Sequence, residues 1–258
     1  MSRSLTFFTV AGLLGFAGVA LLTGCDAANG EADAPAPPAV AAFQLDADAF
    51  PDDGARVASG ANFVHAAARV GIVSTVVGLH LVLPAAATEA ATADAPTVAA
   101  GVWTWEATAV VAGTPVDLAL EGTPEGSSID WRLVVTGPEG DPFTYYTATT
   151  GLDGETGTWR LFAPDVDGPV LTASFDVEDL GARALTFRVP DGRDRGGASV
   201  RYATSGDERT FDWTDEPAGN RALIVWDEET RAGAITADGY NGGDRACWDE
   251  NLDDGACD

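Results

Sequence analysis

The chain has 258 residues, with 40 Asp and Glu against 14 Lys and Arg, and its formal net charge is −26. Hydrophobic residues make up 46% of it, which excludes a disordered acidic polymer and leaves enough apolar material for one large domain or two small ones. The charge argues against nucleic acid as a partner and against electrostatic docking on an anionic membrane.

Residues 1–24 have the features of an export signal. Arg3 supplies the positive start, and an uncharged apolar stretch follows up to Gly24. The stretch ends in Leu22-Thr23-Gly24-Cys25, which resembles the lipobox of bacterial lipoproteins. The resemblance implies cleavage before Cys25 and acylation of its thiol and new amino group. The protein would then be anchored to a bacterial membrane on the extracytoplasmic side, inner or outer.

An uncleaved transmembrane anchor is the alternative for this segment, because about 20 apolar residues suffice to span a bilayer. Residues 25–41 are rich in Ala, Pro, Asp and Glu, and they predict an extended tether between the lipid and the folded body.

A second apolar block predicts a helix over residues 63–83, within a helical segment, 42–100, that packs on the rest of the protein. Its Val, Ile and Leu side chains cover a wide arc, which favours a helix largely buried in protein. A membrane-contacting helix and a strand are the alternatives. Pro84 is expected to end the helix, and residues 85–99 are expected to form a linker.

From residue 101 to 258 the apolar period becomes two, which is typical of antiparallel sheet with one solvated face. Short connections rich in Gly and Pro favour a meander, and an interior filled by the helix favours a barrel or half-barrel. The expected strands number 10 to 11, near residues 102–112, 116–121, 128–136, 143–149, 156–163, 169–177, 183–189, 198–204, 208–214, 221–227 and 231–237.

The sequence shows no motif of a catalytic nucleophile, a phosphate-binding loop or a zinc site, so we expect no enzyme and no catalytic residue. The sequence favours binding of an apolar small molecule or lipid, or a structural role in the cell envelope. A protein–protein interaction module is the alternative. A cavity lined by Trp103, Trp105 and Trp131 beside the helix would favour the apolar ligand.

The C-terminal segment contains the remaining two cysteines. With Cys25 lipidated, Cys247 and Cys257 form an even pair in an oxidising compartment and predict a disulfide. The loop between them holds Asp249, Asn251 and Asp253, alternating oxygen-bearing side chains that could converge on Ca²⁺. A solvated acidic loop without a cofactor is the other interpretation, and it is the one that we favour.

Overall fold

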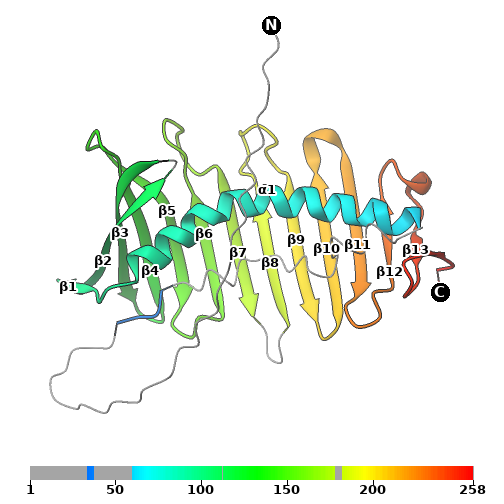
Figure 1. The fold of residues 1–258 in the computed structure, drawn as a ribbon, viewed down its shortest axis with the longest axis horizontal. Helices are drawn as coiled ribbons and strands as arrows, with labels where there is room; N and C mark the ends of the chain where they lie inside the picture. Colours follow the sequence, from blue (N-terminus) through cyan, green and yellow to red (C-terminus); the bar gives the residue numbers. More distant parts are fainter. Residues whose placement is uncertain (1–33, 38–59, 112, 178–181, 258) are drawn as a thin grey trace, which may run out of the picture. The chain divides into compact units, whose positions relative to one another are not determined.

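The structure is a computed structural model that describes residues 34–37, 60–111, 113–177 and 182–257 (Figure 1). Residues 34–37 have no regular secondary structure, and the rest forms one long helix followed by an antiparallel sheet. The predicted class, mainly β with an apolar N-terminal helix, is confirmed. Within the described residues, no helix combines the length and the apolar character that crossing a membrane requires.

Helix α1 spans Ala61–Ala91 and is longer than predicted. The helix continues through Pro84, so the expected linker over 85–99 is wrong: its first part is helical, and Thr97–Ala99 forms the first strand. At about 1.5 Å per residue, 31 residues extend about 46 Å. That length lets one helix contact strands near both ends of the sheet. The packing gained from these contacts outweighs the local preference for ending a helix before Pro.

Fourteen strands follow one another in the sheet in chain order, each antiparallel to the next. The predicted meander is therefore confirmed. The strands are β1 (Thr97–Ala99), β2 (Val102–Val111), β3 (Thr114–Glu125), β4 (Ser128–Thr136), β5 (Pro142–Gly151), β6 (Thr156–Leu161), β7 (Leu171–Val177), β8 (Arg183–Arg188), β9 (Ser199–Ser205), β10 (Glu208–Asp215), β11 (Asn220–Asp227), β12 (Gly233–Ala237), β13 (Ala246–Trp248) and β14 (Asp254–Gly255).

The sheet is open, because β1 and β14 stand at its two ends and do not pair with each other. The closed form of the predicted barrel is thus not found. All eleven predicted strands are present, while β1, β13 and β14 were missed. These three strands have two or three residues each, too few to display an alternation of period two.

One face of the sheet is apolar and buried. Its aromatic side chains pack in pairs from one end to the other: ring centroids lie 5.8 Å apart for Trp105 and Trp131, and 5.3 Å apart for Trp159 and Phe175. Gly122 provides the space for the Trp131 ring, since a Cβ there would lie 2.8 Å from it. We call this side the inner face, and the opposite, polar side the outer face.

Helix α1 lies across the inner face, as Figure 1 shows, with contacts to β12, β13 and β14 and to β2 and β3. Phe63, Ala66 and Val70 are buried, at the spacing of one helical stripe. Val64 and Ile72 on other sides of the helix are 45% and 67% exposed. The expectation of a largely buried helix is therefore wrong for this part, because the sheet covers one side of it only.

Near the other end of α1, the buried hydroxyl groups of Thr88 and Tyr146 lie 2.8 Å apart in a hydrogen bond. Desolvation by burial raises the pKa of Tyr146 from 10.0 to about 12, although the bond to Thr88 opposes the rise. The charged phenolate is thus disfavoured in the folded protein.

We predict a loss of stability at alkaline pH that originates at Tyr146. The folded pKa lies above the unfolded one, so its contribution is complete below pH 10.0 and disappears as the pH rises toward about 12. The expected slope in that window is about 1.4 kcal/mol per pH unit. Denaturant titrations at several pH values measure it, and Tyr146→Phe should make the curve less steep. Burial also raises the pKa of Tyr145 and of Tyr240, so a smaller slope should remain. An equally steep curve in that variant would contradict the assignment. The chain has no Lys, so lysine titration cannot obscure the result.

Candidate functional site

The structure places the three candidate tryptophans in the core. Trp105 and Trp131 are 4% and 2% exposed, and the Trp131 indole N–H donates to the Thr150 hydroxyl at 2.9 Å. Trp103, also on the inner face, packs half-buried against the same core. Trp105 and Trp131 pack against each other, and Trp131 also lines an open hollow together with charged and hydroxyl side chains. The apolar ligand site predicted at the tryptophans stays a prediction. Cys25 lies outside the described residues.

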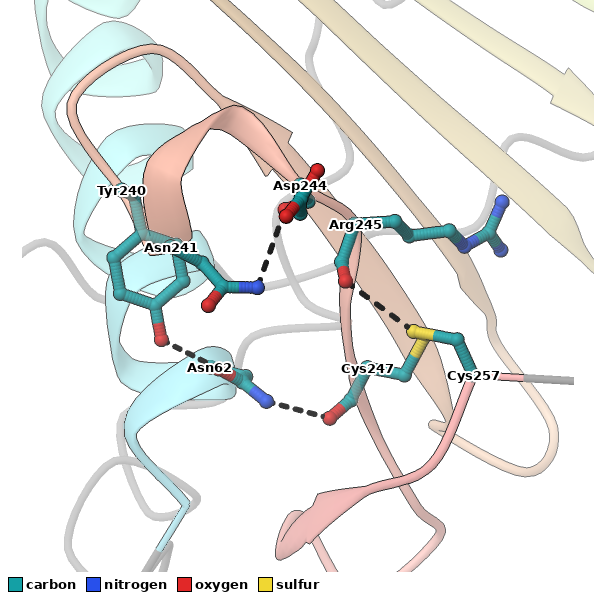
Figure 2. The surroundings of a disulfide bond; sticks show 7 residues. All are labelled: Asn62, Tyr240, Asn241, Asp244, Arg245, Cys247 and Cys257. Carbon is teal, nitrogen blue, oxygen red and sulfur yellow. Dashed lines mark hydrogen bonds between the residues drawn. A yellow bond between two sulfur atoms is a disulfide. The ribbon is translucent and has the colours of Figure 1, made fainter.

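Cys247 on β13 and Cys257 are joined in a disulfide, as the sequence predicted (Figure 2). The bond closes the C-terminal loop against the last long strands. Trp248 beside it is buried, and its indole N–H donates to the backbone oxygen of Arg231 at 2.7 Å. The disulfide thus fixes a segment that is also held by packing.

The closed loop also holds the start of α1, a contact that the sequence did not reveal. The Asn62 side-chain amide donates to the Cys247 carbonyl at 2.7 Å (Figure 2). The Asn62 backbone N–H donates to the Asp254 carboxylate at 2.8 Å. The Tyr240 hydroxyl donates to the Asn62 side-chain oxygen. The first backbone N–H groups of a helix have no acceptor within the helix, and Gly60 has no side chain to cap them. Asp254, near the C-terminus, supplies this acceptor.

The acidic loop uses its first carboxylate internally. One Asp249 oxygen accepts the backbone N–H groups of Asn251 at 2.9 Å and of Asp253 at 3.1 Å. Within the described residues, no three His, Cys, Asp or Glu side chains are grouped so that they could hold a metal ion. The geometry therefore gives Asp249 a turn-forming role and lends no support to the calcium hypothesis for Asp249, Asn251 and Asp253.

We predict that Asp249→Ala lowers the free energy of unfolding by about 1 kcal/mol, because two backbone donors lose their acceptor. Asp249→Asn keeps one side-chain oxygen and should lose less. Asn251→Ala, which removes an exposed amide, is the matched control and should be nearly neutral. Thermal unfolding with millimolar Ca²⁺ or Mg²⁺ tests the alternative: a rise specific to Ca²⁺ that Asp249→Ala removes would contradict the turn-forming role.

The outer face carries two neighbouring open hollows over the middle of the sheet. One, of about 530 Å³, is lined by residues of β3 to β6; the other, of about 590 Å³, is lined mainly by β5 to β8, and Thr149 and Thr158 belong to both. In the first, the Arg132 guanidinium donates twice to one Glu121 oxygen, at 2.9 and 2.6 Å. Arg160 lines the same hollow and is exposed.

The composition of the outer face changes along the sheet. On β2, β3 and β4 its positions include four acidic residues, Glu106, Asp117, Glu121 and Asp130. In β6 to β9 the two central rows contain hydroxyl groups and guanidinium groups alone. We call this set the hydroxyl–arginine face: Thr158, Arg160, Thr172, Ser174, Thr186, Arg188, Ser199 and Arg201.

Comparison with models of known protein families, with curated proteins and with solved structures found no match. The fold defines the chain as an open antiparallel meander crossed by one helix. Sequence reasoning missed the hydroxyl–arginine face, although its signal was present. The outward positions of four predicted strands could have been read together, and they contain a single acid, Asp176, in a chain with 40 acids.

Proposed function

We propose that this protein is a non-catalytic, lipid-anchored binding protein of the bacterial cell envelope, and that it holds its ligand on the outer face of the sheet. The lipid on Cys25 would tether the protein to the membrane, and residues 25–41 would hold the sheet away from the bilayer. The contrast between the two faces supports this function most directly. The inner face is packed against α1 and its own aromatic rings, whereas the outer face is hollowed and polar.

This proposal changes the ligand that the sequence favoured. An apolar small molecule needs an apolar cavity, but Trp105 and Trp131 fill their part of the inner face. The hollows of the outer face are lined mainly by Thr, Ser and charged side chains, with Trp131 in one and Phe175 in the other, and this lining favours a polar ligand.

A protein partner is a second candidate, which exposed apolar side chains favour. Val98 on the edge strand β1 is 48% exposed, and Val110 on β2 is 71% exposed. An edge strand with unpaired backbone groups can add a strand from another chain.

The proposed function is tested by sedimentation of the purified protein with isolated cell-envelope material. We expect the protein to bind envelope material from which the membrane lipids have been removed by extraction. Thr158→Glu with Thr186→Glu should abolish that binding by placing acids on the outer face. Val98→Asp at the sheet edge is the matched control, because it adds a negative charge away from the hollows. Loss of binding in the control but not in the double variant would favour the protein partner.

The anchor makes a separate prediction. Cys25→Ser should abolish incorporation of labelled acyl chains and leave an unprocessed precursor, because the acylated thiol is what the lipobox resemblance implies. Metabolic labelling followed by mass spectrometry of the N-terminus measures both effects. Cys257→Ser serves as the control for loss of a cysteine and should still be labelled. Lipid labelling that persists without Cys25 would contradict the anchor.

A further inference from the structure

We propose that the hydroxyl–arginine face binds an anionic polysaccharide, a carbohydrate chain with carboxylate or sulfate groups. This inference rests on the proposed function and names the class of ligand for the same face. It concerns β6 to β9, where the central outward positions carry three arginines and no acid.

Charge complementarity is the first argument. In a chain with 40 acids, the outward positions of β6 to β9 contain one, Asp176, which lies near the end of β7 in the row beside the two central rows. Arg160 and Arg201 are exposed, and neither makes an ion pair or side-chain hydrogen bond with another described residue. Two unpaired guanidinium groups keep all their donors for a ligand, and guanidinium is suited to planar carboxylates and to sulfates. Asp212 on β10 stands opposite Arg201, and its carboxylate pairs with Arg221 at 2.7 Å. Screening over about 8 Å at physiological salt limits the repulsion from acids farther away.

The spacing of the cations is the second argument. Arg160 on β6 and Arg188 on β8 lie in one row, separated by Thr172 on β7. The Arg188 guanidinium also pairs with the exposed Asp191 carboxylate at 3.1 Å. Two strand spacings amount to about 9.6 Å. Arg201 stands in the adjoining row, opposite Thr186. Sparse cations along an extended surface fit a chain that carries a charge on some of its sugar units. They fit duplex DNA poorly, since it has one charge per about 1.7 Å and is repelled by a net charge of −26.

The chemistry between the arginines is the third argument. Five hydroxyl groups occupy the other positions of the two rows, and each is both a donor and an acceptor. Sugar hydroxyl groups need the same dual partners. No aromatic side chain stands in these rows, so the face lacks the stacking platform on which single-stranded nucleic acids depend.

The test measures binding of the mature lipidated protein, held in detergent micelles, to immobilised alginate, a carboxylated polysaccharide. Neutral dextran, single-stranded DNA and vesicles with anionic lipid are run beside it. We expect binding to alginate that weakens with salt, and weaker or absent binding to the other three. Arg160→Gln with Arg201→Gln should weaken alginate binding roughly tenfold, since each substitution removes charge-assisted contacts.

Arg245→Gln is the matched control, because it changes the same charge on the distant C-terminal segment and should leave binding unchanged. Unaltered thermal unfolding of the double variant and of the control would show that the fold is intact. Equal binding to dextran, tighter binding to DNA or to vesicles, or no effect of the double variant would each overturn the inference. The proposed function would survive those results if binding to envelope material persisted, and it would fail if the wild-type protein bound no such material.

Discussion

Phe63→Ala should lower the free energy of unfolding by about 3–5 kcal/mol, one of the largest effects expected of a single substitution here. Phe63 is 2% exposed on α1, and its ring meets that of Trp248 edge-on at a centroid distance of 5.9 Å. The residue thus joins the first helical turn to strand β13. Truncation leaves a cavity where helix, sheet and C-terminal segment meet, and this cavity cannot collapse without moving all three.

Ile72→Ala is the matched control, because it shortens an aliphatic side chain of the same helix that is 67% exposed. Its effect should lie within about 0.5 kcal/mol of zero. Urea denaturation followed by tryptophan fluorescence measures both variants. If the two lost similar amounts of stability, α1 would not be docked through the face that contains Phe63, and its role as a cover of the inner face would be wrong.

Opening the disulfide should have the second large effect. Cys247 and Cys257 are 10 positions apart, and the chain-entropy estimate for so short a loop is about 2–3 kcal/mol. In a domain of this size that loss lowers the melting temperature by roughly 5–10 °C. Thermal unfolding with and without a thiol reductant measures it, and the Cys257→Ser variant, which should not respond to the reductant, is the control.

The structure predicts a second effect of reducing the disulfide, in addition to the change in loop entropy. Asn62 is held by the Cys247 carbonyl and the Asp254 carboxylate, both on the segment that the disulfide closes. Opening the loop should therefore loosen the start of α1. In a double-mutant cycle, Asn62→Ala should cost less stability in the Cys257→Ser background than in the wild type. Strict additivity of the two substitutions would mean that the disulfide does not support the helix contact.

Much of the candidate site could not be predicted, because it depends on register. The two central outer rows of β6 to β9 exist because Arg160 pairs with Thr172 and Thr172 with Arg188 across three strands. A shift of one residue in any of these pairings would turn one strand's hydroxyl and arginine side chains toward the inner face. The alternation predicts which residues of a strand share a side, but it does not determine which residues of different strands stand next to one another.

The sequence by itself determined the β class, the antiparallel meander, the eleven longer strands, the presence of an N-terminal helix and the cysteine pairing. Each depends on local information: a period of two or 3.6, turn residues at short intervals, or the count of available cysteines. The strand Ser128–Thr136 was predicted with its observed bounds, because Ile129, Trp131 and Leu133 alternate with Asp130 and Arg132, and a Gly-Pro turn follows Thr136.

Tertiary structure decided the rest, because those features arise from contacts between distant residues. The helix continues past Pro84 across a wide sheet, although its local sequence favours an end there. Its start is capped by Asp254, 192 positions away. Asp249 stabilises a turn because its carboxylate accepts hydrogen bonds from two backbone N–H groups. Openness, too, is a property of the whole sheet: the strands at its two ends have three and two residues and do not pair with each other.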